Sequence, residues 1–420
     1  MRPSGEEGCA LKLIVRSAYL EEMASLALTP DIKVITGVRR SGKSKLMEAF
    51  SERLKQADAG ANIIHINFNL TEFEGLLEYH ALEQYIEARY QPGKNNYVLI
   101  DEVQMCPSFE KAINSLHAKE KYDIWVTGSN AFLQSSDLAT LFVGRTYEVH
   151  VFPFSFSEYL AYYPAENLYG SLSSYIREGG MAGSYLYRNE AQKYRYINTE
   201  VLNALIVRDI MTKYHLRNEP LLHELIDFLM DNIGNVTSVR TIADTLASGK
   251  KKADHKTIGK YIDALCKAFA FCRIRRYDIR GKRYLRSEDK YYLTDHSFRF
   301  ARLGTKNMDY GRVLENIVAV ELLRRGYEVY VGVLYQKEID FVAIRQGERL
   351  YIQVANDISS PDTFRREIDP LLRIRDAYPK LLIARIYQPA WQHEGIRIMD
   401  AADWLADAVP QSEGLLGFGE

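Results

Sequence analysis

The residues best suited to chemistry lie in one stretch, which reads Gly37-Val-Arg-Arg-Ser-Gly42-Lys43-Ser44. It follows an apolar run at 31–36 that is typical of a buried strand. In such a stretch glycines let backbone N–H groups curl around a phosphate at the start of a helix. Lys43 would reach the β- and γ-phosphates of a nucleotide, and the Ser44 hydroxyl would bind Mg²⁺. The sequence therefore predicts a site for ATP and Mg²⁺. The residues expected to contact ATP are Gly37, Val38, Arg39, Arg40, Ser41, Gly42, Lys43, Ser44 and Lys45.

Two adjacent carboxylates, Asp101 and Glu102, end the short apolar run at 97–100. At the tip of a buried strand beside the phosphate loop, Asp101 would hold Mg²⁺. Glu102 would polarise the attacking water. An isolated acidic pair is often only a solvated strand end, but its position after a phosphate loop favours the metal-binding and catalytic roles.

Two polar residues farther along, Asn130 and Arg145, are further candidates for ATP hydrolysis. Asn130 stands at the end of the next expected strand, where its amide could hold the lytic water or sense the γ-phosphate. Arg145 precedes another strand and could act as an arginine finger across a subunit boundary, which would require a homo-oligomer. The alternatives are a turn residue at Asn130 and a surface ion pair at Arg145.

The elements that position these residues alternate between strand and helix. Strands are expected at 31–36, 62–70 and 97–100, with helices at 46–54 and 76–90 between them. This order predicts an α/β fold of the P-loop NTPase type, with three layers and a mostly parallel sheet. The strand that ends at Asn130 needs a place beside both the strand at 31–36 and the strand at 97–100. We therefore expect an additional strand between those two.

Several longer motifs carry a family resemblance. They are ITGVRRSGKS at 35–44, LIDEVQ at 99–104, VTGSNAFL at 126–133, VGRTYEV at 143–149, FPFSFSEYL at 152–160 and REGGMAGSY at 177–185. Together they resemble a family of prokaryotic AAA-type ATPases whose C-terminal half is a domain of unknown function. The resemblance covers nearly the whole chain. It implies an ATPase of the additional-strand class, a winged helix-turn-helix in the middle and a restriction-endonuclease-like domain at the C-terminus.

The segment after the nucleotide domain is expected to be helical, with a turn at Gly179-Gly180. We interpret it as a lid on the nucleotide domain. By the family resemblance, Arg208 and Asp209 are candidates for sensing the nucleotide state, and an ion pair on a helix face is the alternative.

The next segment reads as three helices and a hairpin that turns at Gly281, the order of a winged helix-turn-helix. The third helix would enter a major groove. Residues 249–290 hold 14 Lys and Arg against 5 Asp and Glu, which favours contact with DNA or RNA phosphates. The alternative is a solvated face on a connector, because most charge runs face solvent. The residues expected to contact nucleic acid are Lys252, Lys256, Lys260, Arg280 and Lys282.

The C-terminal part reads as helix, three strands, helix and strand, the order of a restriction-endonuclease-like core. Active members of that fold bind Mg²⁺ through carboxylates and activate water with a lysine. Asp340 stands at one such position, and strand alternation places Glu338 on the same face. The partner positions hold Gln353, a weak ligand for a hard cation, and Ala355, which cannot activate water. We therefore expect a degenerate nuclease site formed by Glu315, Asp340 and Gln353, and a metal site rebuilt from Glu315 and Glu338 is the alternative.

Composition limits the remaining functions. The chain has 54 Lys and Arg against 55 Asp and Glu, so its overall charge gives no attraction to nucleic acid or membrane. Its four cysteines form no CxxC pair, which favours reduced thiols. No apolar run has the length of a membrane span, and the N-terminus lacks a signal-peptide core, so we expect a cytoplasmic protein that does not contact membranes.

Together these observations predict a Mg-ATP-dependent ATPase that moves a winged helix and a catalytically silent nuclease-like module, in association with nucleic acid. Two alternatives stay open: an ATP-gated regulatory switch that acts on a protein partner, and an ATP-dependent nuclease. The expected domains are an ATPase domain at 1–150, a helical lid at 151–218, a winged helix at 219–300 and a nuclease-like domain at 301–420.

Overall fold

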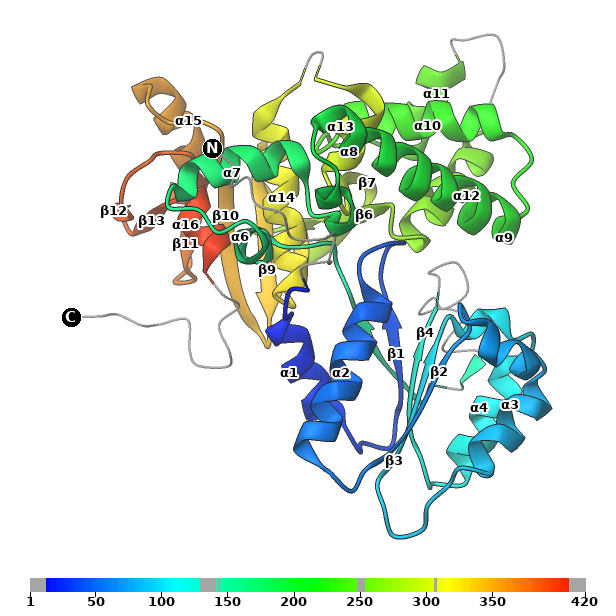
Figure 1. Ribbon diagram of the computed structural model, residues 1–420. Helices are drawn as coiled ribbons and strands as arrows, with labels where there is room; N and C mark the ends of the chain where they lie inside the picture. The colour runs from blue at the N-terminus through cyan, green and yellow to red at the C-terminus, as the bar shows by residue number, and fades with distance from the viewer. Residues whose placement is uncertain (1–12, 129–140, 143, 248–253, 306–307, 408–420) are drawn as a thin grey trace.

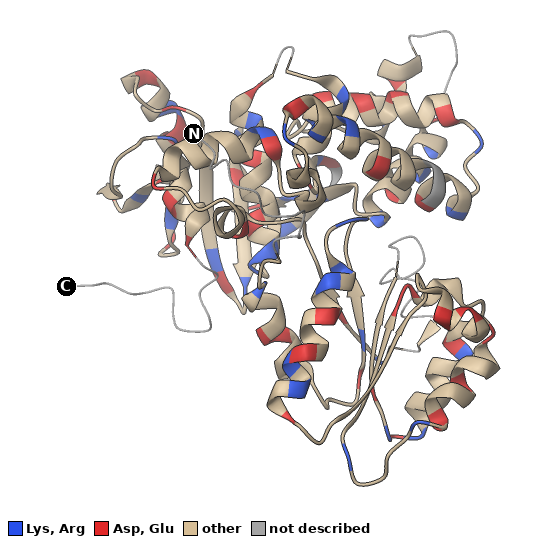
Figure 2. Cartoon of the chain, viewed as in Figure 1, with Lys and Arg blue, Asp and Glu red and all other residues tan. Residues whose placement is uncertain are grey.

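The computed structural model describes residues 13–128, 141–142, 144–247, 254–305 and 308–407. The chain forms two lobes: an N-terminal lobe that ends with the fifth strand at His150, and a larger lobe made by the residues after it (Figure 1). Each lobe is built on its own β-sheet. Lys and Arg are interspersed with Asp and Glu over both lobes (Figure 2), in keeping with the nearly balanced charge.

The N-terminal lobe is built on a five-stranded parallel sheet in the order β2-β3-β4-β1-β5. Its strands are β1 (Ile32–Thr36), β2 (Asn62–Asn67), β3 (Asn96–Asp101), β4 (Asp123–Thr127) and β5 (Thr146–His150). β4 lies between β1 and β3, which confirms the additional strand expected there.

Helices cover both faces of this sheet. They are α1 (Ser17–Leu26), α2 (Lys43–Ala57), α3 (Tyr79–Glu87) and α4 (Phe109–Ala118), with short 3-10 turns η1 (Thr71–Leu76) and η2 (Val103–Met105). On one face α1 and α2 pack against Leu99 and Trp125, and the Phe50 ring lies 4.6 Å from Trp125. On the other face α3 and α4 pack against Val98 and Ile100. The predicted three-layer α/β fold is therefore confirmed.

The larger lobe begins with the helical segment that the sequence predicts. Its elements are α6 (Phe156–Tyr162), α7 (Leu168–Glu178), η3 (Ala182–Leu186), α8 (Glu190–Tyr196), η4 (Ile197–Asn203), η5 (Leu205–Met211) and α9 (Thr212–Tyr214). The expected turn separates α7 from η3. A Cβ on Gly180 would lie 2.2 Å from the Phe154 carbonyl oxygen, so this turn packs tightly against the chain that leaves β5.

Three helices and a hairpin follow in the expected order. They are α10 (Glu219–Asp231), α11 (Val239–Ala247), α12 (His255–Lys267), β6 (Phe271–Asp278) and β7 (Arg283–Leu293). Thr237, before α11, forms an antiparallel bridge with Asp289 of β7. A short helix, α13 (Ser297–Leu303), ends this part of the lobe.

The second sheet has eight strands in the order β12-β13-β11-β10-β9-β8-β6-β7. The elements after α13 are α14 (Tyr310–Arg324), β8 (Glu328–Leu334), β9 (Lys337–Arg345), β10 (Glu348–Ala355), α15 (Pro361–Leu372), β11 (Lys380–Ala384), β12 (Trp391–His393), β13 (Ile396–Asp400) and α16 (Ala401–Ala406). β6 pairs in parallel with β8, so the hairpin and the C-terminal strands share one sheet. The domain boundary expected at residue 300 therefore falls between parts of a single hydrogen-bonded sheet.

Among the residues described, none of the helices combines the length and the apolar character that crossing a membrane requires.

Candidate active site

The loop between β1 and α2 forms a tight cradle at the carboxyl end of β1. Gly37 has a φ of 141° and Gly42 a φ of 97°, a backbone region that favours glycine. A Cβ on Gly37 would lie 2.1 Å from the Val151 carbonyl oxygen. The backbone therefore requires both glycines, and the loop leads directly into the N-terminus of α2, where a phosphate can bind.

The Lys43 ammonium lies buried in this cradle. It donates to the Gly37 carbonyl oxygen at 2.8 Å. Burial lowers the pKa of Lys43, and the nearby carboxylates of Glu102, Asp101 and Asp209 oppose this effect. A backbone carbonyl thus holds the ammonium at the loop, where a nucleotide phosphate could replace it as the acceptor.

Asp101 ends β3 at the sheet edge that also holds the phosphate loop. The Thr127 hydroxyl, at the end of β4, donates to Asp101 Oδ1. Asp101 Oδ2 is buried and accepts no hydrogen bond within the part of the chain that the structure describes. Because buried polar atoms normally have partners, an unpartnered carboxylate oxygen fits a Mg²⁺ ion or its water. Ser44, half-buried in the first turn of α2, completes the set of residues that would hold this ion.

Glu102 follows Asp101 in a left-handed conformation, with a φ of 56°. A non-glycine residue there costs about 1–3 kcal/mol, and such strain is found mostly at functional sites. The Gln104 side-chain amide donates to Glu102 Oε2, and the Glu102 N–H donates to the Thr127 hydroxyl at 3.4 Å. The backbone of Glu102 is therefore held beside the end of β4, and its carboxylate is held by Gln104.

Arg16, which sequence reasoning missed, ties the phosphate loop to the larger lobe. It donates to the carbonyl oxygens of Ser41 at 3.1 Å and Phe152 at 2.9 Å. It also forms a two-bond pair with Glu158 at 2.6 and 3.0 Å. Burial opposes the charge of Arg16, but Glu158 raises the pKa of the guanidinium above its ordinary value. Ser155 and Glu158 form a capping box at α6, yet no sequence pattern links that signal to Arg16.

Asp209 of η5 approaches the phosphate loop from the larger lobe. It is buried, and its charge raises the pKa of Lys43. The sensing role expected for Asp209 stays a prediction. The side chain of Arg208, its expected companion, lies outside the described residues.

His150, at the end of β5, forms a second contact between the lobes. Its Nδ1 lies 3.1 Å from the Thr36 hydroxyl, and its ring lies 4.2 Å from the ring of Phe269, which follows α12. Burial, with the charges of Lys43 and Arg324, lowers the pKa of His150 to about 3, so the ring is neutral near pH 7. This neutral ring links the end of β1 to the turn between α12 and β6.

Arg145 lies at the opposite edge of the sheet from the phosphate loop. It directly precedes β5, whose first residue Thr146 pairs with Ile32 at the start of β1, and its side chain is exposed. The length of β1, about 17 Å, separates it from the loop of the same chain. Arg145 therefore does not lie at the phosphate loop of its own chain, and its action as an arginine finger across a subunit boundary stays a prediction. Asn130 lies outside the described residues.

The residues expected to contact nucleic acid lie on separate elements. Lys256 and Lys260 are exposed on α12, and Arg280 and Lys282 are exposed in the turn between β6 and β7. Lys252 lies outside the described residues.

The carboxylates of the expected nuclease site surround a lysine. The Lys290 Nζ of β7 lies 2.9 Å from Glu315 Oε1 and 2.7 Å from Glu338 Oε1. Burial opposes its charge, but Glu315, Asp340 and Glu338 raise the pKa of Lys290 above its ordinary value. Burial, together with the charge of Glu315, raises the pKa of Asp340 well above its usual range. Glu315 and Glu338, the alternative metal ligands, thus share an ammonium group.

Gln353, the third residue of that expected site, binds protein groups on both sides. Its Oε1 accepts from the Asp340 N–H at 3.3 Å, and its amide donates to Glu367 Oε2 at 3.1 Å. Over the described residues, no group of three or more His, Cys, Asp and Glu side chains is placed to hold a metal ion.

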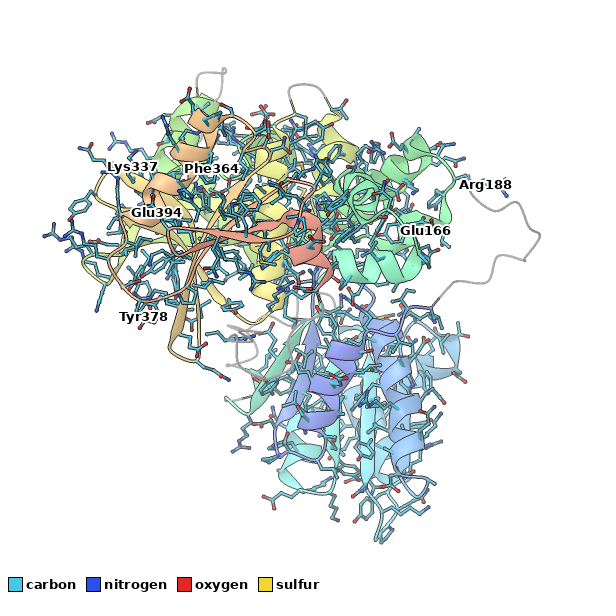
Figure 3. All side chains as sticks on the ribbon, turned by 90° about the vertical axis from the view of Figure 1, so that its left-hand side faces the viewer. Glu166, Arg188, Lys337, Phe364, Tyr378 and Glu394 are labelled. Carbon is cyan, nitrogen blue, oxygen red and sulfur yellow. The ribbon has the colours of Figure 1, made fainter. Side chains whose placement is uncertain are left out.

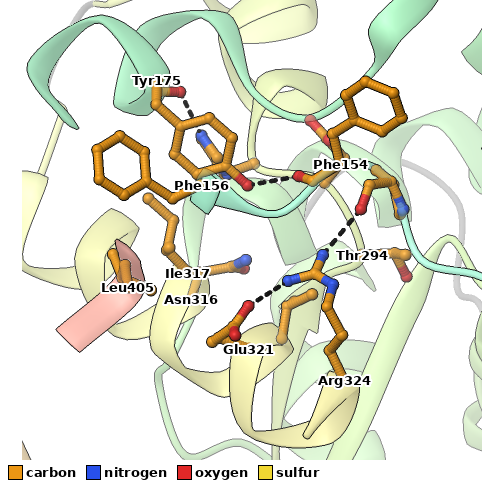
Figure 4. A pocket seen from close by; sticks show the side chains of 13 residues that line it. Phe154, Phe156, Tyr175, Thr294, Asn316, Ile317, Glu321, Arg324 and Leu405 are labelled. Carbon is orange, nitrogen blue, oxygen red and sulfur yellow. Dashed lines mark hydrogen bonds and ion pairs between the residues drawn. The ribbon is translucent and has the colours of Figure 1, made fainter. Parts of the chain in front are cut away.

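A narrow pocket lies where the chain leaving β5 meets the larger lobe (Figure 4). Arg324 of α14 donates to the Pro153 carbonyl oxygen at 2.8 Å. The Tyr175 hydroxyl donates to the Phe154 carbonyl oxygen at 2.8 Å, and His296 Nε2 lies 2.8 Å from the Tyr175 carbonyl oxygen. The connection between the lobes is therefore fixed through its backbone to α7 and α14.

A protein of Haemophilus influenzae, described as uncharacterized, is 38% identical over 402 residues, which cover 94% of this chain and 98% of that protein. The chain belongs to the same family as this protein. A second relative, the uncharacterized protein MJ1544 of Methanocaldococcus jannaschii, is 26% identical over 374 residues, 84% of this chain and 81% of that protein.

Two family models match separate parts of the chain. The model described as AAA domain matches residues 29–160, which confirms the AAA-type domain predicted from the sequence. The model of the domain of unknown function DUF8612 matches residues 169–309, which span the helical segment and the hairpin.

Two solved structures are similar to parts of this chain at low sequence identity. The Walker-type ATPase paby2304 of Pyrococcus abyssi is 14% identical with a TM-score of 0.41, over 69% of this chain and 96% of that one. The replication initiator DnaA bound to AMPPCP and single-stranded DNA is 15% identical with a TM-score of 0.31, over 61% of this chain and 90% of that one.

Proposed function

We propose that the protein binds Mg-ATP at the loop between β1 and α2 and hydrolyses it. The observation that carries this proposal is the buried, unpartnered Asp101 Oδ2 at the sheet edge that holds Lys43. When bound, Mg²⁺ would neutralise phosphate oxygens as charge develops on them. Lys43 adds a second cation at the phosphates, and Glu102 orients and polarises the attacking water.

Replacement of Glu102 by Gln tests the hydrolytic role. The variant keeps the shape and the hydrogen-bonding capacity of the side chain but loses the base, so ATP binding should persist while turnover falls about 10²- to 10⁴-fold. Glu52→Gln is the matched control, because Glu52 is exposed on α2, where it pairs with Lys55. Steady-state phosphate release measures turnover. Equal turnover in wild type and Glu102→Gln would overturn the proposal.

We further propose that the nucleotide state is transmitted to the larger lobe. Three features support this: the Arg16–Glu158 pair, the ring contact of His150 with Phe269, and the effect of the Asp209 charge on the pKa of Lys43 in the phosphate loop. Because each begins at or beside the loop or the end of β1, a shift of the loop on ATP binding would alter all three together.

The receiving parts are, in this proposal, a winged helix and a nuclease-like module that does not cleave. The order of α10, α11, α12 and the β6–β7 hairpin, with its bridge to Thr237, supports the winged helix. The order α14, β8, β9, β10, α15, β11 supports the nuclease-like core. The ammonium of Lys290 between Glu315 and Glu338 favours a silent module over an ATP-dependent nuclease. The exposed basic residues on α12 and in the β6–β7 turn favour nucleic acid as its partner.

A further inference from the structure

A row of tyrosines and one arginine crosses a face of the eight-stranded sheet, and the ATP site does not use it. The rings of Tyr284 and Tyr330 lie 5.0 Å apart, and those of Tyr330 and Tyr277 lie 5.9 Å apart. The Arg349 guanidinium lies 5.2 Å from the Tyr277 ring and 5.2 Å from the Tyr378 ring. We call these five residues the aromatic row. They come from β7, β8, β6, β10 and the segment before β11, so the row runs across the strands.

Part of this row is anchored in the core and part is open to solvent. Tyr277 is buried in the core that α15 completes, and Tyr330 packs against that core. By contrast, Tyr284 is 58% exposed and Tyr378 is 40% exposed. Phe364 of α15 and Tyr378 lie on the same side of the molecule (Figure 3). The row thus presents accessible aromatic rings on a rigid support.

The turn between β6 and β7 adds positive charge beside the row, because Tyr284 lies at the end of this turn. The Arg280 guanidinium lies 5.2 Å from the ring of Tyr335, which is 68% exposed. Arg280 and Lys282 are exposed, and neither forms an ion pair with any residue that the structure describes. Arg283, also in this region, pairs with Asp278 at 3.3 Å.

Other carboxylates near the row are engaged by tyrosine hydroxyls. Glu328 Oε2 accepts from the Tyr330 hydroxyl at 3.1 Å, and Asp376 Oδ2 accepts from the Tyr351 hydroxyl at 2.6 Å. The β6–β7 turn therefore combines the open rings of Tyr284 and Tyr335 with the exposed cations of Arg280 and Lys282.

We propose that the aromatic row and the β6–β7 turn bind single-stranded nucleic acid. Bases stack on the open rings of Tyr284, Tyr335 and Tyr378, and the phosphates lie against Arg280 and Lys282. A duplex hides its base faces, so the same surface discriminates against it. The inference rests on the nucleic-acid part of the proposed function and specifies the strandedness and the site, and it does not depend on ATP hydrolysis.

Fluorescence anisotropy of the full chain tests this site with three labelled probes of equal length: oligothymidylate, an abasic strand and a duplex. Oligothymidylate should bind most tightly. Tyr284→Ala and Tyr335→Ala should each weaken its binding about 5- to 100-fold, because one stacked base is lost. Arg280→Ala should lower the magnitude of the slope of log K against log salt by about 0.7. Tyr387→Ala is the matched control: Tyr387 is 56% exposed and also lies near an arginine, but it is outside the row.

Three results would overturn the site: wild-type affinity in Tyr284→Ala, equal affinity for the abasic strand, or a preference for the duplex. Wild-type affinity in Tyr284→Ala or equal affinity for the abasic strand would show that bases do not stack on these rings. A preference for the duplex would favour α12 as the element that contacts nucleic acid. Tyr284 and Tyr335 are largely exposed, so their replacement should leave the fold intact, and circular dichroism checks this. Lys43→Ala should still bind oligothymidylate, because Lys43 lies in the ATP site. Loss of ATP binding and loss of oligothymidylate binding are therefore separate outcomes.

Discussion

The buried Lys290 makes a quantitative prediction about the larger lobe. Lys290→Met keeps a side chain of similar length and removes the ammonium that Glu315 and Glu338 share at 2.9 and 2.7 Å. Removing one partner of a buried ion pair costs about 3–5 kcal/mol, because it leaves the other charge buried and unpaired. The Lys290 and Glu315 side chains are 3% and 12% exposed, whereas Glu338 is 38% exposed and screened by water. We therefore expect a loss near the lower end, about 3 kcal/mol.

Urea unfolding at pH 7, followed by far-UV circular dichroism, measures this loss. Lys256→Met is the control, because Lys256 is exposed on α12 and its replacement should change stability by less than about 0.5 kcal/mol. A second expectation follows from the same geometry. In Lys290→Met the two glutamates are oxygen ligands without a cation, so Ca²⁺ should raise the urea midpoint of this variant more than that of the wild type.

Two results would refute this reasoning. If Lys290→Met were as stable as the control variant, the ammonium would not neutralise these carboxylates. If Ca²⁺ stabilised the wild type as much as the variant, removal of Lys290 would open no cation site at Glu315 and Glu338, and this expectation would fail.

Two further substitutions test the packing of the larger lobe. Because the pKa of Asp340 is raised, the folded chain keeps this proton at a pH where the unfolded chain has lost it, and stability falls as pH rises above about 4. Asp340→Asn keeps an oxygen that can accept from the Val354 N–H, so this variant should be more stable than wild type at pH 8. The gain in stability, measured as the difference between the urea midpoints, should shrink toward pH 4. A gain that is the same at every pH would contradict this reasoning. Gly180→Ala should destabilise the protein by about 1–3 kcal/mol, because its Cβ would lie 2.2 Å from the Phe154 carbonyl oxygen. Gly75→Ala is its control, since a Cβ there would meet nothing within 4 Å; equal urea midpoints for the two alanine variants would show that the turn has room.

The features that the sequence predicts are those with local signals. Gly37, Gly42 and Lys43 indicate the phosphate loop by their spacing. Asp101 and Glu102 end a short apolar run that forms β3. The additional strand could be expected because the polar strand needed a place in the sheet. Helix and hairpin order in the middle part also follows from apolar spacing and turn residues.

The features that the sequence does not reveal depend on residues far apart in the chain. Arg16 and Glu158 are 142 positions apart and share no periodic pattern. Lys290 comes from β7, outside the segment that reads as a nuclease core, so the ion pairs with Glu315 and Glu338 could not be foreseen. For the same reason the pairing of β6 with β8, which joins two expected domains in one sheet, appears only in the structure.

Calorimetric titration of the chain with Mg-ATP tests the central claim most directly. The account predicts saturable heat for the wild type, weaker binding when EDTA removes Mg²⁺, and loss of binding in Lys43→Ala, whose ammonium lies in the loop beside Gly37. No heat of association for the folded wild type, or equal affinity in Lys43→Ala, would contradict it.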